Sequence, residues 1–408
     1  MPLYNNDMSK VIVHIDLNAF FARCEEIRDP SLENKPVAIG HDGRGGIVST
    51  CSYKAREYGV SSAMPMFKAK ELCPHLIIKP VDFRFYGAYS DRFKKFVKRY
   101  TKIVESASID ECFADFTETI KDIKDVPAFF RKLQMDLYNE TGLKCSIGVA
   151  PTKFLAKMGS DYKKPMGLTI IRRSKVREIL WPLSIDKMFG IGKKTCPRLK
   201  ALGINTIGDL GEACNREDER IKNELGKFFY VIKDWVNGYG SDEVITEPDD
   251  PKSIGNSTTL HEDTNSHDLI METFKWLSKE VSERAIHENK LGPTIQIVVK
   301  ESAFTDTGFK VHNKSKTLDN PTNNADVIFN TAMDLYDKNF SHMTIRLLGV
   351  TLQNLIGTKD VAIQMSLFDY QQHEEESATK LLINDFNRKL KKKALMRASE
   401  VETHGRNK

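Results

Sequence analysis

Apolar and polar residues alternate in short runs that predict strands, and these runs are separated by longer periodic segments that predict helices. The β-branched run 10–16 (KVIVHID) predicts a strand ending at Asp16, and residues 17–24 are expected to form a helix. Residues 47–59 predict a second strand followed by a short helix, and the alternation over 108–116 (SIDECFADF) predicts a further strand or hairpin.

The same pattern continues in the second half of the chain. Helices are predicted at about 266–289 and 324–339, and strands at 294–300 and 344–352. Between the two halves, residues 241–251 are acidic and contain proline, which is typical of a linker. The chain is therefore predicted to have an α+β multidomain fold.

Two adjacent acids, Asp110 and Glu111, lie within the predicted strand at 108–116, without a cation close in sequence. A solvated turn is the ordinary interpretation of such a pair. Asp16, at the end of another predicted strand, changes that interpretation, because buried carboxylates need cations or hydrogen bonds. Three carboxylates from two neighbouring strands predict a site for two Mg²⁺ ions, which prefer oxygen ligands and suit displacement at phosphorus.

Composition narrows the classes of protein that fit. The chain has 408 residues, 40% hydrophobic and 29% charged, a length that suggests about three domains. No apolar run approaches the roughly 18 residues of a membrane span, and the polar first residues lack the apolar stretch of a signal peptide. The 7 cysteines include no Cys-x-x-Cys pair, which indicates neither a zinc site nor disulfides. We expect a cytoplasmic protein with no membrane association.

The net charge of +5 is mild, so binding of a polyanion would depend on local clusters. Residues 161–200 contain eleven Lys or Arg against three Asp or Glu. Within them, Gly190-Ile191-Gly192 between helical segments, followed by Lys193 and Lys194, matches a helix-hairpin-helix, whose glycines let backbone N–H groups approach a phosphate. A helical hairpin with a solvated basic face is the alternative.

A second group of residues is suited to phosphate. Tyr53 and Arg56 are three residues apart and share a face of the predicted helix, so their hydroxyl and guanidinium groups can bind phosphate oxygens together. Lys164, in a predicted loop, supplies another cation. Taken singly, each of these is more often a surface residue than a ligand.

Five ordered motifs over about residues 8–357 resemble the Y-family translesion DNA polymerases, most closely the bacterial DNA polymerase IV group (DinB type). They are HIDLNAFFA at 14–22, STCSYKAR at 49–56, SSAMP at 61–65, SIDE at 108–111 and KPMG at 164–167. The resemblance implies a template-directed, low-fidelity polymerase that binds primer-template DNA. Such an enzyme adds dNTPs to a primer 3′-hydroxyl by two-metal nucleotidyl transfer and releases pyrophosphate.

The resemblance also implies roles for particular residues. Two Mg²⁺ ions would be held by Asp16, the backbone carbonyl of Leu17, Asp110 and Glu111. The nucleotide would be contacted by Phe21, Thr50, Tyr53, Arg56 and Lys164. Phe21 would be the steric gate that excludes a ribose 2′-hydroxyl, whereas spacing alone suggests an ordinary core aromatic. DNA would be contacted by Gly190, Gly192, Lys193, Lys194, Lys310, Lys314 and Lys316, although a solvated loop is the alternative for the last three.

The implied architecture is a right-hand polymerase. It has a ferredoxin-like palm, small fingers, a helical thumb with the helix-hairpin-helix, and an α+β little finger. The expected boundaries are palm 1–18 and 83–171, fingers 19–82, thumb 172–240, linker 241–251, little finger 252–357 and tail 358–408.

The tail contains Gln364-Met365-Ser366-Leu367-Phe368, which fits the peptide by which bacterial polymerases bind the replication sliding clamp. Gln364 would form hydrogen bonds, while Leu367 and Phe368 would enter an apolar pocket. A chance match is the alternative for so short a motif. The protein is expected to act as a monomer.

Two other classes of function use some of the same features. A metal-dependent nuclease would also need clustered acids and a helix-hairpin-helix, but would not need the set of Tyr53, Arg56 and Lys164. A non-catalytic DNA-binding scaffold would tolerate loss of the acids, all three of which are present.

Overall fold

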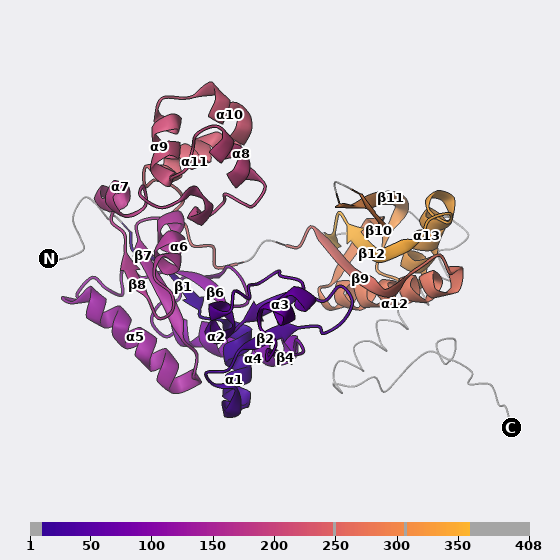
Figure 1. Cartoon of the computed structure of the whole chain (residues 1–408), viewed down its shortest axis with the longest axis horizontal. Coiled ribbons are helices and arrows are strands. Elements are labelled where there is room, and N and C mark those ends of the chain that lie inside the picture. Colours follow the sequence, from indigo (N-terminus) through magenta and orange to yellow (C-terminus); the bar gives the residue numbers. More distant parts are fainter. Residues whose placement is uncertain (1–9, 248–249, 306–307, 360–408) are drawn as a thin grey trace. The chain divides into compact units, whose positions relative to one another are not determined.

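The computed structural model describes residues 10–247, 250–305 and 308–359. The chain divides into two compact units, Met1–Asp249 and Asp250–Lys408, each of which is described by itself (Figure 1). Within the described residues, no helix combines the length and apolar character that crossing a bilayer requires.

A five-stranded sheet forms the centre of the first unit, with the order β5-β6-β1-β7-β8. Its strands are β1 (Ile12–Leu17), β5 (Val104–Ser106), β6 (Glu111–Asp115), β7 (Cys145–Ala150) and β8 (Leu168–Ile170). The central strand β1 is buried throughout and pairs antiparallel with both β6 and β7, while β8 adds parallel to β7. The predicted strands that carry Asp16 and Glu111 are therefore direct neighbours.

Helices cover both faces of this sheet (Figure 1). Val13 and Ile15 of β1 belong to a core shared with α4 (Phe83–Val97) and α5 (Val126–Thr141). Ile12, on the opposite face, packs in a second core with α6 (Lys153–Tyr162). Because side chains alternate along a strand, Asp16 projects on the same face as Ile12, toward α6.

Close backbone contact fixes α6 against the sheet. A Cβ on Gly148 of β7 would lie 1.9 Å from the carbonyl oxygen of Ala156 and 2.4 Å from the nitrogen of Ser160. Only glycine leaves space for this approach, which sets the distance between the α6 side chains and β1.

A smaller three-stranded sheet, with the order β3-β2-β4, lies between β1 and α4 in the sequence. Its region comprises α1 (Phe20–Arg28), a 3₁₀ helix (Pro30–Leu32), β2 (Val37–Gly40), β3 (Val48–Cys51), α2 (Tyr53–Glu57), α3 (Met66–Leu72) and β4 (Ile77–Lys79). The strand and helix predicted over 47–59 are confirmed, with Ser52 capping α2. The helix predicted from residue 17 begins later, because β1 continues through Leu17 and Ala19 has a left-handed φ of 47°.

A helical region follows β8, and its apolar residues belong to the same core that packs α6 against Ile12 of β1. It contains 3₁₀ helices at Arg173–Lys175 and Ile185–Lys187, and α7 (Val176–Ile179), α8 (Thr195–Ala201), α9 (Ile207–Asn215), α10 (Glu219–Leu225) and α11 (Phe228–Val236). The predicted helical segment before Gly190 is only the second of these 3₁₀ helices, whereas α8 forms after Gly192 as expected.

The second unit is an antiparallel sheet with the order β11-β10-β12-β9, packed against two helices. Its elements are β9 (Ser253–Thr264), α12 (His267–His287), β10 (Lys290–Thr305), β11 (Gly308–Thr322), α13 (Ala325–Asn339), β12 (Ile345–Gln353) and β13 (Ile356–Gly357). Both predicted helices and both predicted strands of this region are confirmed. The sequence did not reveal β9 and β11, whose residues are mostly polar and exposed or half-buried.

Candidate functional site

Two of the predicted acids face each other across neighbouring strands. The register of β1 and β6 pairs Asp16 with Glu111, so that their side chains leave the sheet on the same face, toward α6. The Asp16 side chain is 7% exposed and that of Glu111 24% exposed. Two carboxylates in a largely desolvated position repel each other unless cations lie between them.

The third predicted acid is adjacent in the backbone, but its carboxylate points elsewhere. The carbonyl oxygen of Asp110 accepts a hydrogen bond from the Leu17 N–H at 3.0 Å, which ties the acidic segment to the end of β1. The Asp110 carboxylate instead accepts a 2.6 Å bond from the Ser108 hydroxyl. In the part of the chain that is described, no three His, Cys, Asp or Glu side chains converge closely enough to form a metal site.

Lysines from α6 and the following loop neutralise the carboxylates. Lys157 Nζ lies 2.6 Å from Glu111 Oε1 and 3.2 Å from Asp16 Oδ2, and Lys164 Nζ lies 2.8 Å from Asp16 Oδ2. Asp161 contacts both ammonium groups, at 3.3 Å and 2.8 Å. The sequence predicted Lys164 but not Lys157 or Asp161, although their i, i+4 spacing on a helix that follows a buried strand was a usable signal.

The ionisation of this cluster follows from burial and from these contacts. Burial raises the pKa of Asp16, and its hydrogen bond with Glu111 raises it further. Burial also acts to raise the pKa of Glu111, but its interactions with His14, Asp16 and Lys157 together outweigh burial and lower that pKa. The pKa of Lys157 is raised, because attraction to Asp16 and Asp161 overcomes the effect of burial. When all of these groups are ionised, the three carboxylates of Asp16, Glu111 and Asp161 exceed the two ammonium groups by one negative charge, which a divalent cation would offset.

A buried histidine, His14, lies on β1 two residues before Asp16. His14 Nδ1 is 2.7 Å from Ser160 Oγ, and Ser160 donates its own proton to the Lys157 carbonyl, so His14 is the donor to Ser160. His14 Nε2 then faces Glu111 Oε2 at 3.7 Å without a hydrogen bond. Burial lowers the pKa of His14.

The predicted phosphate contacts lie on β3 and α2. Arg56 lies over the Tyr53 ring at 4.9 Å, and Thr50 precedes them on β3. The Tyr53 hydroxyl is buried and makes no hydrogen bond, while Arg56, Lys164 and Asp16 are near enough to act on it electrostatically. A buried hydroxyl without a hydrogen bond destabilises the protein, unless a bound ligand supplies the missing partner.

A buried amide network holds the loop that carries Lys164. Asn18 accepts the Met166 N–H at 2.8 Å and donates to Ser146 Oγ at 2.9 Å. Ser146 Oγ also accepts the Gly167 N–H at 3.2 Å. These bonds join the end of β1 to the loop, so Asp16 and Lys164 keep fixed positions relative to each other.

Comparison with known proteins gives a consistent family. Residues 15–161 match the impB/mucB/samB family, residues 173–204 the HHH motif of the IMS family, and residues 251–367 the C-terminal domain of the impB/mucB/samB family. DNA polymerase IV of Bacillus velezensis is 37% identical over 97% of this chain and 95% of its own length. DNA polymerase IV 1 of Bacillus subtilis is 36% identical over 97% of this chain and 96% of its own. The chain belongs to the Y-family DNA polymerases.

Solved structures agree with this assignment. A Y-family DNA polymerase chimera, Dbh-Dpo4(243-245)-Dbh, is 27% identical, with a TM-score of 0.74 over 85% of this chain and 99% of that chain. An insertion ternary complex of Dbh DNA polymerase has a TM-score of 0.57 at the same identity and the same coverage of both chains. The predicted fold class, with palm, fingers, helix-hairpin-helix thumb and little finger, is confirmed. The protein is a DNA-directed DNA polymerase of the translesion type.

In this polymerase, the predicted gate residue belongs to an aromatic cluster. Phe21 stacks on Tyr86 of α4 at 4.4 Å between ring centroids, and Phe83 meets it edge-on at 6.0 Å. The Tyr86 hydroxyl donates to the buried Glu25 carboxylate at 2.9 Å. The cluster joins α1 to α4 and restricts the orientation of the Phe21 ring.

The predicted DNA contacts of the thumb lie in the turn before α8. Gly190 has a φ of 90°, and a Cβ there would lie 2.9 Å from the Trp235 ring, so the turn requires glycine. At Gly192 nothing lies within 4 Å of an added Cβ, and Lys193 and Lys194 are exposed. The turn is thus accessible from outside, as phosphate binding needs.

The predicted contacts of the little finger lie on strand β11, not on the solvated loop considered as an alternative. Lys314 and Lys316 pair with Ile297 and Ile295, which are buried against the helices, so the two lysines project on the helix-covered side of the sheet. Lys316 also contacts Asp334 of α13 at 3.3 Å. Lys310 lies on β11 as well and is exposed.

Two cations of the second unit were missed by sequence reasoning. Lys300 pairs with Val311 and lies on the face that the helices leave open. Lys300 and Arg346 both approach the Phe309 ring, at 4.7 Å and 4.6 Å. Neither residue belongs to a basic run in the sequence, so only strand pairing reveals them.

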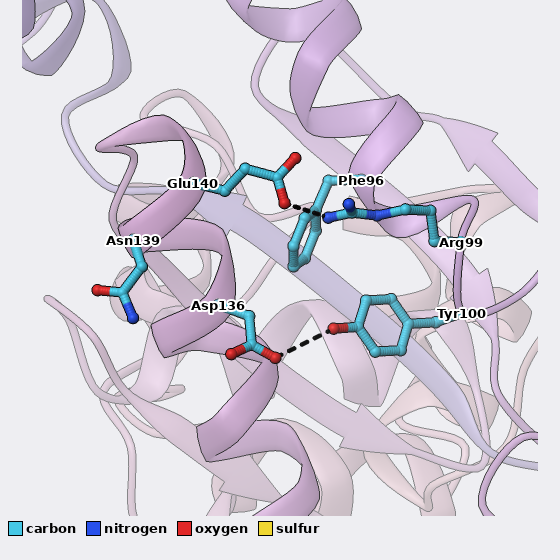
Figure 2. A pocket seen from close by; sticks show the side chains of 6 residues that line it. All are labelled: Phe96, Arg99, Tyr100, Asp136, Asn139 and Glu140. Carbon is cyan, nitrogen blue, oxygen red and sulfur yellow. Dashed lines mark hydrogen bonds and ion pairs between the residues drawn. The ribbon is translucent and has the colours of Figure 1, made fainter.

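A hollow of about 440 Å³ lies elsewhere, between the end of α4 and α5 (Figure 2). Arg99 meets Glu140 across it at 2.6 Å, and Tyr100 donates to Asp136 at 3.4 Å. The residues that line it include none of those predicted for catalysis or nucleotide binding.

The amide network generates a prediction for Asn18→Ala. The substitution leaves the Met166 N–H without its acceptor, which we expect to cost about 1–3 kcal/mol and to loosen the loop of Lys164. Thermal unfolding and hydrogen exchange at the Met166 amide measure both effects. Asn215→Ala, which removes exposed bonds to Asn237, is the control, and equal exchange at Met166 in the two variants would contradict the role of Asn18.

Proposed function

We propose that this polymerase adds dNTPs to a primer 3′-hydroxyl, as its template directs and with low fidelity, by two-metal nucleotidyl transfer at Asp16, Asp110 and Glu111. The observation that carries the proposal is the pairing of Asp16 with Glu111 opposite a buried Tyr53 hydroxyl without a partner. Asp16 and Glu111 supply oxygen ligands for cations, and the region of the Tyr53 hydroxyl supplies donors for an anion. A nucleotide bound together with divalent ions satisfies both.

The donor set fits Mg²⁺. The ligands would be the carboxylates of Asp16, Asp110 and Glu111 and the backbone carbonyl of Leu17, all of which are the hard oxygen donors that this ion prefers. Two bound Mg²⁺ ions would favour ionisation of the primer hydroxyl and stabilise the charge that develops on the leaving pyrophosphate. The register of β1 and β6 keeps Asp16 and Glu111 adjacent, while Asp110 would give up its hydrogen bond from Ser108 to join them.

The triphosphate would be held by residues from two regions. Tyr53 and Arg56 present a hydroxyl and a guanidinium from one helix, and Thr50 adds a hydroxyl from the strand before it. Lys164 would exchange its contacts with Asp16 and Asp161 for phosphate oxygens. Phe21 would lie against the sugar, since its ring is held by Tyr86 and Phe83.

Primer-template DNA would lie against the thumb turn at Gly190, Gly192, Lys193 and Lys194, and against the little finger. There, Lys310, Lys314 and Lys316 stay predictions, and Lys300 and Arg346 are further candidates. We place the palm at 1–18 and 83–171, the fingers at 19–82, the thumb at 172–240, the linker at 241–251 and the little finger at 252–357. The protein would act as a cytoplasmic monomer, and its seven free cysteines suit a reducing compartment.

Asp110→Asn tests the catalytic proposal. Loss of one anionic ligand removes several kcal/mol of transition-state stabilisation, so primer extension with dNTPs and Mg²⁺ should slow on the order of a thousandfold. Asp115→Asn is the control: Asp115 lies at the far end of β6, where its carboxylate accepts the Thr117 N–H, and the variant should extend normally. Cleavage of the DNA without extension would favour the nuclease instead.

Phe21→Ala tests the gate. Removal of the ring relieves a steric clash worth about 1–3 kcal/mol, so incorporation of ribonucleotides relative to deoxynucleotides should rise roughly ten- to hundredfold. Single-nucleotide insertion with paired dNTP and rNTP measures the ratio. Phe67→Ala, at a side chain 68% exposed on α3, should leave it unchanged. Unaltered sugar discrimination in Phe21→Ala would refute the assignment.

The clamp-binding proposal concerns Gln364, Leu367 and Phe368, which lie outside the described residues. Deletion of 364–368 removes the anchoring side chains and should weaken binding to the purified sliding clamp by roughly thirtyfold or more. Surface plasmon resonance measures this effect. Deletion of 396–400 is the control of equal length, and synthesis without the clamp should be the same in both. Equal clamp affinities would argue against the motif.

A further inference from the structure

Lys157 contacts the site acids, yet it has no part in the proposed reaction. Its Nζ lies within 3.3 Å of three carboxylates, those of Glu111, Asp16 and Asp161. Its side chain is only 11% exposed. Lys164 also lies among the acids, but it pairs with Asp16 and Asp161, and it has a proposed role at the triphosphate.

The position of Lys157 is set by the backbone. The close approach of α6 to β7 at Gly148 fixes the helix, and the Ser160 hydroxyl bonds both the Lys157 carbonyl and the buried His14 ring. The largely buried side chain of Lys157 thus holds its ammonium group beside the acids.

A cation in this position has two opposite effects on divalent ions. It offsets the repulsion between Asp16 and Glu111, which stabilises the protein without metal. It also repels an incoming dication and holds the oxygens that the dication needs. The second effect is reduced once a triphosphate brings negative charge to the site.

We propose that Lys157 is a resident counter-ion that competes with divalent cations for Asp16 and Glu111, so that metal binds weakly until a nucleotide triphosphate arrives. The inference rests on the proposed function, since it assumes that these acids bind metal. It assigns to Lys157 a positioning and regulatory role: it controls the order in which the site fills.

The test is titration of the full-length protein with Mn²⁺, without DNA or nucleotide, followed by electron paramagnetic resonance of the free ion. Removing one positive charge within a few ångströms should lower the dissociation constant of Lys157→Met on the order of tenfold. Lys153→Met is the matched control one helical turn away, because its ammonium pairs with Glu105 at 2.6 Å and not with the site acids. It should bind Mn²⁺ like the wild type.

A second readout is thermal stability. In EDTA, Lys157→Met should melt at a lower temperature than the wild type. Added Mn²⁺ should raise the melting temperature of Lys157→Met by more than it raises that of the wild type. Lys157→Arg retains the charge and should keep the wild-type Mn²⁺ affinity. Should circular dichroism show Lys157→Met to be unfolded, Lys157→Gln is titrated in its place.

The outcomes separate the inference from the proposed function. Equal or weaker Mn²⁺ binding after loss of the charge, with the wild type binding measurably, overturns the role of Lys157 and leaves the metal site intact. Failure of every variant to bind Mn²⁺, with or without dNTP, contradicts the metal site and the inference with it.

Discussion

The repulsion between Asp16 and Glu111 is the constraint on which the site depends. Strand pairing places the two carboxylates side by side on the face that α6 covers, where burial limits screening by water. The surrounding cations are therefore a structural requirement as well as a catalytic resource. The same excess of negative charge would be neutralised by Lys157, by Lys164 and by any bound metal.

The fold supplies these cations from different parts of the sequence. Helix α6 lies against the sheet because Gly148 permits backbone contact, and it brings Lys157 and Asp161 to the acids. The loop that follows carries Lys164 and is tied to β1 through Asn18. Tyr53 and Arg56 come from a separate small sheet and helix. The acids thus come from two adjacent strands, while the groups around them come from a helix, a loop and a separate region of the first unit.

The sequence was most informative where chemistry and pattern coincide. Asp16 and Glu111 could be predicted because each acid sits in a strand-like run, which makes an unpaired charge conspicuous. Lys157 was missed, because a lysine on a helix normally points to solvent; its i, i+4 spacing with Asp161 was a signal, but the tertiary structure was needed to show that both meet Asp16 and Glu111. Strands β9 and β11 were missed because an exposed sheet face and an edge strand need no apolar residues. The side of the sheet on which Lys314 and Lys316 project depends on register, which the sequence alone leaves open.

The aromatic cluster around Phe21 has a consequence for substrate selection. The proposed gate ring rests on Tyr86, and Tyr86 is held by the Glu25 carboxylate, so the position of the ring is determined across the seam between α1 and α4. The proposed selectivity for the sugar would then be a property of that seam and not of one side chain. Substitutions at Tyr86 or Glu25, neither of which need touch a nucleotide, would then shift the balance between ribose and deoxyribose.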